Sequence, residues 1–378
     1  MRGGKIVFFS GGTALRRLAR ALATKYPRTV HLVTTFDSGG SSAILRKTFA
    51  IPAVGDLRNR MLSLADPAFT GPEVINLWNT RFPTEGDPGV VRAELLKYAK
   101  TLFSGWNGIP EKTRDSLLRC LRFFFQRMPD DFEARGASLG NLFVTGAFLE
   151  FNREFIPAVN FFSQLLRVRG VVLPITNANL HLGARLKDGA TIIGQHLFKS
   201  LPSPVDSLFL TVHESAAALE NEPVRCFPDV FPEAADQIRA GKVIVYPMGS
   251  FYSSIVANLV PRGVGAAVAA TDAVKIFIPN TGKDPESLGL TIPEQARTII
   301  NVLRKDAPDA LNGRLLQYAL IDRKRGVYPG SFTPAMEKAM RELGVRIIDR
   351  DMIYENDPRA HDPEAILKTL REFAEKNA

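Results

Sequence analysis

Short apolar runs recur along the chain and predict buried strands. Residues 5–9 (KIVFF) and 29–36 (TVHLVTTF) are nearly continuous in apolar and β-branched character, and Leu15, Leu18 and Leu22 lie between them at helical spacing. A strand, an amphipathic helix and a second strand in this order form a βαβ unit. Because the apolar residues do not alternate with polar ones, we expect strands that are covered on both faces, as in a parallel sheet between layers of helices.

Further apolar runs repeat this signal later in the chain. They occupy residues 168–176, 207–213, 242–250, 265–280 and 345–353. We therefore predict a doubly wound, mostly parallel, Rossmann-like α/β fold that forms a single domain over residues 1–378. In open α/β sheets ligands bind beyond the carboxyl ends of the strands, so those ends are where the site is expected.

Residues 71–135 differ from this pattern, because aromatic and charged residues are mixed there at helical spacing. They predict an inserted helical lid or subdomain. Trp78 and Trp106 lie within it and could stack on a flat ligand, but core packing or a subunit contact is the better interpretation. From residue 355 onward we expect one amphipathic helix that closes the fold.

Composition is that of a globular protein, with 378 residues of which 45% are hydrophobic and 23% charged. No stretch approaches the roughly 18 uninterrupted apolar residues of a membrane helix, and the start lacks a signal peptide's apolar core. We therefore expect a cytoplasmic protein with no membrane partner. Cys120 and Cys226 lack the spacing of a zinc site or a disulfide framework and are interpreted as buried thiols.

The net charge of +9 is concentrated near the start of the chain, where residues 1–50 hold nine Lys or Arg and a single acidic residue, Asp37. A nucleic-acid-binding protein would also be basic, but no interleaved aromatic motif or recognition helix accompanies the charge. We therefore expect no nucleic-acid partner. A small ligand that carries phosphate explains the excess more economically.

The first candidate site is "SGGTA", residues 10–14, between the first strand and its helix. A helix amino terminus presents unpaired N–H groups and the positive end of its dipole, which suits a phosphate. Gly11 and Gly12 would let the backbone approach a ligand closely, and Ser10 and Thr13 could add hydroxyl donors. The alternative is a plain tight turn, since the stretch matches neither G-x-G-x-x-G nor the lysine-bearing P-loop.

The second candidate follows the second strand as "TTFDSGGSSAILR", residues 34–46. Its carboxylate, Asp37, could accept hydrogen bonds from a sugar hydroxyl or hold a divalent cation that bridges phosphate oxygens. The alternative for Asp37 is a helix N-cap, and Ser41 and Ser42 could equally be caps.

Two further stretches carry polar residues at predicted helix starts. In "AVGDLRNRMLSLAD", residues 53–66, Arg58 could grip phosphate and Asn59 could read a base or amide edge, or Asp56 could simply cap the helix and pair with Arg58. In "GASLGNLFVTG", residues 136–146, Ser138 and Asn141 could either bind a ligand or cap the helix.

Taken in order, these stretches resemble the CofD/YvcK family. It comprises the 2-phospho-L-lactate transferases of deazaflavin coenzyme biosynthesis and bacterial relatives that bind UDP-sugars and influence cell-wall or carbon metabolism. The family typically reads GGTG, DDGGSSGxLR, PGDxRN, HSxGN, VLPxT and GPGSLYTSxxPNL. This chain reads "GGTA", "DSGGSSAILR", "VGDLRN", "ASLGN", "VLPIT" and "YPMGSFYSSIVANL" in the same order. It is most similar to the YvcK-like branch and to the CofD-related proteins of the GAK system.

The resemblance implies a ligand set and an assembly that the residues alone do not give. It implies a nucleotide diphosphate or UDP-sugar as ligand, Mg²⁺ held by Asp37, and a homodimer. The residues that it places around the ligand are Gly11, Gly12 and Thr13 at the diphosphate, Asp37, Gly39, Gly40, Ser41 and Ser42 in the same crevice, Asn141 at the nucleotide, and Gly249, Ser250 and Ser253 in a second polar loop.

Three positions depart from the family pattern. Ser38 replaces a second acidic residue, which removes one carboxylate from a Mg²⁺ site. Ala137 replaces a histidine and removes a candidate general base, while Ala14 replaces the fourth glycine.

These observations lead to one expected function and two alternatives. We expect a CofD-like transferase that moves a phosphorylated group from a nucleotide diphosphate donor to an acceptor hydroxyl, with Arg58 neutralising charge and either Asp37 or Asp56 as base. The first alternative is a non-enzymatic YvcK-like regulatory protein that binds a UDP-sugar. The second, a nicotinamide-dependent oxidoreductase, lacks the G-x-G-x-x-G fingerprint.

Overall fold

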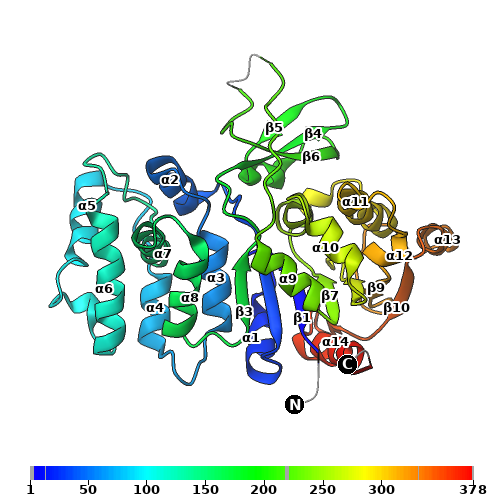
Figure 1. Cartoon of the computed structure of the whole chain (residues 1–378), viewed down its shortest axis with the longest axis horizontal. Coiled ribbons are helices and arrows are strands. Elements are labelled where there is room, and N and C mark those ends of the chain that lie inside the picture. Colours follow the sequence, from blue (N-terminus) through cyan, green and yellow to red (C-terminus); the bar gives the residue numbers. More distant parts are fainter. Residues whose placement is uncertain (1–3, 13, 218–220, 331, 377–378) are drawn as a thin grey trace.

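A seven-stranded parallel sheet forms the centre of the computed structural model, which describes residues 4–12, 14–217, 221–330 and 332–376 (Figure 1). The strand order is β10-β9-β8-β7-β1-β2-β3. The strands are β1 (Ile6–Ser10), β2 (Thr29–Val33), β3 (Val171–Pro174), β7 (Val243–Tyr246), β8 (Val274–Phe277), β9 (Tyr318–Ile321) and β10 (Arg346–Asp349). The predicted α/β class with a mostly parallel, doubly wound sheet is confirmed.

The order of the strands reverses at β1. From β1 the chain runs outward through β2 and β3 on one side, and from β7 through β10 on the other. In register, Ser10 pairs with Val33 of β2, and Ile6 pairs with Val243 of β7. Such a switch point opens a crevice at the carboxyl ends of the strands, which is where α/β proteins bind ligands.

Helices cover both faces of the sheet. Successive β1 side chains point to opposite faces, and those on both faces are buried. Ile6 and Phe8 pack in a cluster with α1 (Arg16–Lys25) and α14 (Pro363–Lys376). The helices on the other face are α9 (Pro232–Ala240), α10 (Val264–Ala270) and α11 (Ile292–Arg304), whose cluster includes Val7 and Phe9, with α12 (Asn312–Leu315) and α13 (Pro334–Glu342) farther out. Every side chain of β1 is buried, which explains its unbroken apolar sequence.

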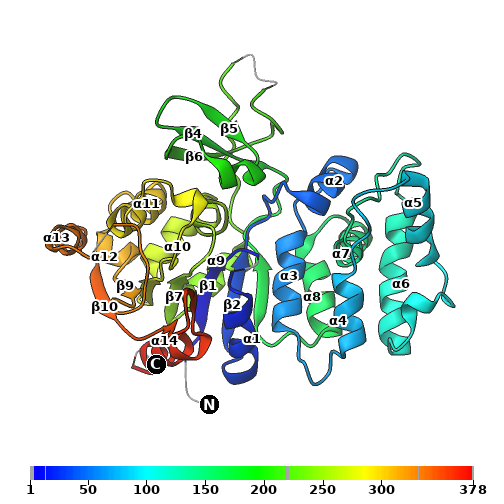
Figure 2. The same ribbon diagram turned by 180° about the vertical axis from the view of Figure 1, so that it is seen from behind.

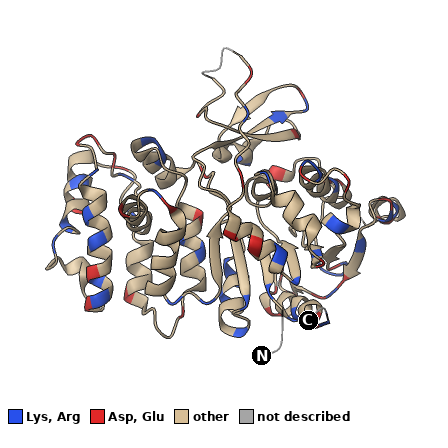
Figure 3. Cartoon of the chain, in the orientation of Figure 1, with Lys and Arg blue, Asp and Glu red and all other residues tan. Residues whose placement is uncertain are grey.

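A group of helices lies beside the β3 edge of the sheet (Figure 2). It contains α2 (Gly40–Phe49), α3 (Gly55–Leu64), α7 (Leu139–Glu150) and α8 (Phe155–Leu165), together with α4 (Pro72–Asn79), α5 (Pro88–Lys97) and α6 (Glu111–Phe125) from the predicted insertion. These helices share one hydrophobic cluster, and charged side chains lie along the outer helices α5 and α6 (Figure 3). A lid role for residues 71–135 stays a prediction.

The two tryptophans belong to the interior of this helical group. Trp78 is fully buried and its ring centroid lies 5.0 Å from that of Phe162, while Trp106 packs edge-on against Tyr98 and at a tilt against Phe143. The structure therefore favours core packing over ligand stacking for both. Of the two cysteines, Cys120 is buried and Cys226 is partly exposed.

Three sequence-based expectations about elements were wrong. Residues 207–213 fall in β6 (Val205–Thr211), which joins β4 (His181–Leu186) and β5 (Thr191–Ile193) in a separate antiparallel sheet rather than the parallel one. An unbroken apolar run shows burial on both faces but not strand direction, and β6 is buried within the large cluster that also covers β7.

The other two errors concern boundaries. Residues 265–280 begin inside α10 and only then form β8, because the alanines at the start of this stretch favour a helix over a strand. The tail from residue 355 is not one helix, since β12 (Asp357–His361) pairs with β11 (Ile353–Tyr354) before α14 begins. Within the described ranges, no helix has the length and apolar character needed to cross a membrane.

Candidate functional site

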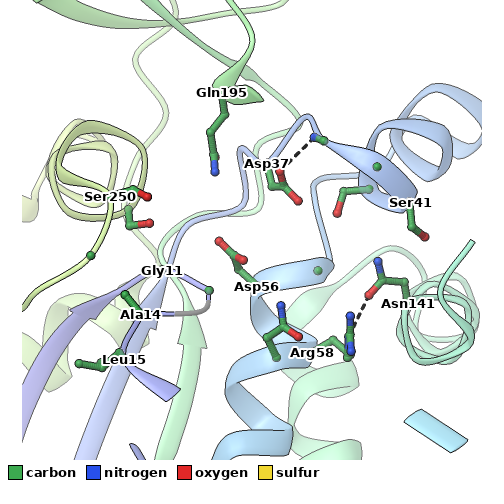
Figure 4. Close-up of a pocket in the computed structure, with 18 of the residues that line it drawn as sticks. Gly11, Ala14, Leu15, Asp37, Ser41, Asp56, Arg58, Asn141, Gln195 and Ser250 are labelled. Atoms are coloured by element: carbon green, nitrogen blue, oxygen red, sulfur yellow. Dashed lines mark hydrogen bonds between the residues drawn. The ribbon is translucent and has the colours of Figure 1, made fainter. Parts of the chain in front are cut away.

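A cavity of about 670 Å³ opens at the carboxyl ends of β1, β2 and β7 (Figure 4). We call it the main cavity. Its lining residues come from seven parts of the chain: Gly11, Gly12, Ala14 and Leu15 after β1; Asp37, Gly39, Gly40, Ser41 and Ser42 after β2; Gly55, Asp56, Arg58 and Asn59; Arg81; Asn141; Gln195 and Lys199; and Met248, Gly249, Ser250 and Ser254 after β7.

The first two glycine turns meet in this cavity because their strands are neighbours. Ser10 ends β1 directly beside Val33, the last residue of β2, so the chain leaves both strands at the same edge of the sheet. The turn after β1 contributes Gly11 and Gly12, and the segment after β2 reaches the cavity at Asp37. Two sequence-local patterns thus become one site through a single parallel pairing.

Close approach explains why glycine occupies both positions of the first turn. A Cβ atom on Gly11 would lie 2.0 Å from Ser254 Oγ and 3.2 Å from its Cα. A Cβ on Gly12 would lie 2.3 Å from Oδ1 of Asp56. Any side chain at these positions would displace groups that line the cavity.

Asp56 lies in the first turn of α3 and points toward the centre of the cavity (Figure 4). Burial, reinforced by the nearby charge of Asp37, raises the pKa of Asp56 to about 7. Arg60 and Arg58 act in the opposite direction but do not offset the burial. The carboxyl group can therefore gain or lose a proton near neutral pH.

Asp37 faces Asp56 from the turn after β2. Its Oδ1 accepts a hydrogen bond of 3.0 Å from the backbone N–H of Gly39, and Gly39 itself is the N-cap of α2. Buried Arg46 supports this turn from behind, since its guanidinium donates to the carbonyl oxygens of Asp37 and Leu180. Asp37 is therefore not the N-cap of α2. Its carboxylate accepts a hydrogen bond from the capping residue Gly39 and remains in the wall of the main cavity.

Two arginines of α3 carry positive charge near the main cavity, and among the described residues neither forms an ion pair with a carboxylate. Arg58 Nε donates to Asn141 Oδ1 at 3.1 Å, and Arg60 Nη2 donates to the carbonyl oxygens of Gly11 and Gly12 at 2.6 and 3.2 Å. Arg60 is fully buried, and its Nε and Nη1 find no partner among the described residues. Burial lowers the pKa of each arginine to about 10, so both remain cationic at neutral pH.

The β7 side of the cavity carries Gly249 and Ser250 and then the π-helical turn η3 (Phe251–Ile255). Ser253 points away from the cavity, because its hydroxyl donates to Glu286 Oε1 at 2.5 Å and its N–H donates to Oε2 at 2.8 Å. The neighbouring Ser254 lines the cavity instead. Burial raises the pKa of Glu286 to about 7.

The short helix η2 (Gln195–Ser200) covers the opposite side and was not foreseen from the sequence. Gln195 and Lys199 line the cavity, and Gln195 points down toward Asp37 and Asp56 in Figure 4. The residue after Gln195, His196, places its Nδ1 3.0 Å from Ser38 Oγ. This contact ties η2 to the turn that carries Asp37.

Most of the residues singled out from the sequence therefore gather in one place. Of the others, Ser138 lies just outside, buried, with its N–H donating to Ser41 Oγ, and Ser253 is held by Glu286. Thr13 lies outside the described residues. Arg81, Gln195, Lys199 and Ser254 were missed; only the doubled serine of "FYSS" offered a sequence signal.

Asp37 and Asp56 are the carboxylates of the main cavity. Among the described residues no group of three or more His, Cys, Asp or Glu side chains is arranged to hold a metal ion. A carboxylate can still anchor Mg²⁺ when phosphates and waters supply the other ligands. Asp37 could therefore anchor such a cation, while Asp56 keeps the raised pKa that burial gives it.

Comparison with known proteins identifies the family of this chain. The chain is 28% identical over 379 residues to the gluconeogenesis factor of Bacillus subtilis (strain 168), covering 97% of this chain and 96% of that protein, and 26% identical over 355 residues to that of Listeria innocua, covering 93% and 90%. A crystal structure of a UPF0052 family protein (bh3568) from Bacillus halodurans shares the fold, with a TM-score of 0.69 and 24% identity over 98% of this chain and 99% of that one. The family profile described as 2-phospho-L-lactate transferase CofD matches residues 6–353, so the chain belongs to the CofD family.

Proposed function

We propose that the main cavity binds a nucleotide diphosphate derivative and that the protein is a CofD-like transferase. The observation that carries the proposal is the buried, positively charged wall behind two glycine turns. Arg60 is fully buried with two nitrogens unpartnered among the described residues, and Arg58 bonds to an amide rather than to a carboxylate. An anion in the cavity would supply the missing negative charge.

The size and the residues of the cavity support a nucleotide. A volume of about 670 Å³ lies within the usual range for small-molecule sites. Gly11 and Gly12 line the cavity and could present backbone groups to a diphosphate, while Asn59 and Asn141 offer amide groups that could read a base or a sugar. Mg²⁺, where required, would be held by Asp37 together with phosphate oxygens and waters, and it would neutralise charge on the phosphates.

In the proposed reaction an acceptor hydroxyl oxygen attacks a phosphorus atom of the donor diphosphate. The new P–O bond forms as the bond to the nucleoside monophosphate breaks, and the hydroxyl proton passes to a base. Asp56 suits that role better than Asp37, because its pKa of about 7 lets it accept a proton near neutral pH. Arg58 and Lys199, which line the cavity, would stabilise charge on the phosphoryl oxygens, while buried Arg60 would support the turn after β1 from behind.

A regulatory protein that binds a UDP-sugar without turnover is the second candidate. Ser38 stands where the family pattern has a second acidic residue, and its hydroxyl instead contacts His196. The relatives named above are called gluconeogenesis factors, a name that states no chemical reaction. Both observations favour a role in sensing.

Calorimetry and a turnover assay on the same protein separate the two functions. UDP-glucose, GDP and GMP are titrated with and without Mg²⁺, and release of nucleoside monophosphate is measured with a pool of small hydroxyl-bearing metabolites. A transferase binds diphosphates more tightly than GMP and releases monophosphate only when an acceptor is present. A sensor binds without release. Failure of every diphosphate to bind contradicts both.

Asp37→Asn serves as the matched variant for the metal. It keeps the size of the side chain and one acceptor oxygen while removing the charge. We expect its ligand affinity to lose most of the Mg²⁺ dependence, whereas Asp131→Asn, on an exposed loop, should behave as the wild type. An unchanged metal titration would exclude Asp37 as a ligand.

A further inference from the structure

A second cavity of about 360 Å³ lies next to the main cavity, beyond the carboxyl ends of β7 and β8. Ala14 and Met248 line both cavities and so mark their junction. The remaining wall comes from α1, from the residues after β8 and from the β11–β12 hairpin and the start of α14: Arg17, Leu18, Asn280, Thr281, Asp357, Arg359, Ala360, His361, Pro363 and Ile366. We call this space the second cavity.

Two arginines face it from separate elements. Arg17, on α1, makes no hydrogen bond or ion pair with any described residue, so its charge is available. Arg359, on β12, has a side chain that is 83% exposed, and its Nε lies 3.9 Å from Asp357 Oδ1. With one aspartate against two arginines, the lining carries net positive charge.

His361 adds a polar group that lacks a partner. Its Nε2 is buried and forms no hydrogen bond with any described residue. Burial lowers the pKa of His361 to about 4 despite nearby Asp322, so the imidazole is neutral at physiological pH. Since His361 lines the cavity, its imidazole signal should respond to an anion bound beside it.

The rest of the wall is apolar or already satisfied. Leu18, Met248 and Ile366 form its hydrophobic part, and Thr281 Oγ1 donates to Pro358 O at 2.6 Å while accepting from the N–H of Val327. The open hydrogen-bonding capacity therefore belongs to Arg17 and Arg359. Such a mixture selects a short apolar body that carries an anionic group.

We propose that the second cavity is a separate binding subsite for a small carboxylate- or phosphate-bearing molecule with a short apolar body. Arg17 and Arg359 would pair with its anionic group, and the imidazole of His361 would lie beside it. A molecule bound in the second cavity lies beside the nucleotide rather than within the main cavity. It reaches the main cavity at Ala14 and Met248, which line both. The wall residues from Asp357 onward lie beyond residue 353, where the match to the CofD family profile ends.

Nuclear magnetic resonance of the full chain with ¹³C-labelled histidine tests the proposal. The chain has five histidines, so the His361 signal is identified as the one lost in His361→Gln. Inorganic phosphate and propionate are titrated separately, which distinguishes the two anionic groups. We expect at least one of them to shift the His361 signal saturably.

Arg17→Ala and Arg359→Ala should each weaken this binding about tenfold or more, since each removes a charge-assisted contact. Arg20→Ala is the matched control, because Arg20 is an exposed arginine of the same helix that does not line the cavity. An unmoved His361 signal with both anions overturns the proposal, as does equal weakening by Arg20→Ala.

UDP-glucose provides the arm that separates this proposal from the proposed function. If UDP-glucose binds and leaves the His361 signal free to respond to the small anion, both stand. If UDP-glucose alone saturates the His361 shift and blocks the anion, the second cavity holds part of the nucleotide and the proposal is wrong. If no nucleotide binds but the anion response persists, the second cavity stands and the proposed function fails.

Discussion

Asp56→Asn should stabilise the ligand-free protein in a way that depends on pH. The pKa of Asp56 rises from 3.8 to about 7 in the folded protein, because burial and Asp37 disfavour the carboxylate. The folded state therefore binds this proton more tightly than the unfolded state. As pH rises from 3.8 to 7 the wild type loses stability, and above about pH 7 the loss is complete.

The magnitude follows from the two pKa values. Each unit of difference between them corresponds to about 1.4 kcal/mol, so ionised Asp56 costs the folded state on the order of 4 kcal/mol at pH 8. At pH 5 roughly a third of that cost is present. Asparagine has no proton to release, so the stability advantage of Asp56→Asn should grow by about 2–3 kcal/mol between pH 5 and pH 8.

Urea unfolding at pH 5, 6, 7 and 8 in the presence of EDTA measures this advantage. Fluorescence of Trp78 and Trp106 is a suitable signal because both are buried in the folded state. Asp131→Asn, on an exposed loop, controls for the general effect of removing one negative charge. A difference in the free energy of unfolding between Asp56→Asn and wild type that stays constant from pH 5 to pH 8 would show that the pKa of Asp56 is not raised in the folded protein.

Three further predictions use the same structure. Gly12→Val should abolish nucleotide binding while leaving the unfolding midpoint within a few degrees of wild type, because its Cβ would lie 2.3 Å from a movable carboxylate oxygen; retained affinity by calorimetry would move the phosphate elsewhere. Arg60→Lys should weaken nucleotide binding about 10- to 100-fold, because the shorter lysine lacks the Nη2 that donates to the carbonyl oxygens of both Gly11 and Gly12; unchanged affinity would show that Arg60 does not support the turn. Gly146→Ala should lower the free energy of unfolding by about 1–3 kcal/mol, because its Cβ would lie 2.0 Å from Cys120 O in the neighbouring helix; a neutral result in urea would contradict this helix packing.

The parts of the fold that local sequence could predict are those whose signal is local. The unbroken apolar run before Gly11 predicts a strand buried on both faces, and β1 is buried at every position. The glycine turns at the ends of β1 and β2 could be assigned to one site because parallel neighbours end at the same edge. The predicted bounds of β1 agree within one residue, whereas β2 ends at Val33, three residues before its predicted end at Phe36.

The parts that could not be predicted depend on contacts between distant segments. Gln195 and Lys199 reach the main cavity only because the β4–β5–β6 sheet packs above it, more than 150 residues after Asp37. The choice between Ser253 and Ser254 depends on a π-helical turn and on Glu286, which no local pattern indicates. The direction of β6 was misjudged for the same reason, since apolar pattern reports burial but not pairing.

The most direct test of the central claim is a crystal structure of the protein grown with UDP-glucose and Mg²⁺. We expect both phosphates to lie in the main cavity, within hydrogen-bond distance of the backbone N–H groups of Gly11 and Gly12 and facing Arg58. Phosphate density at any other place, with the two glycine turns contacting no part of the nucleotide, would contradict it.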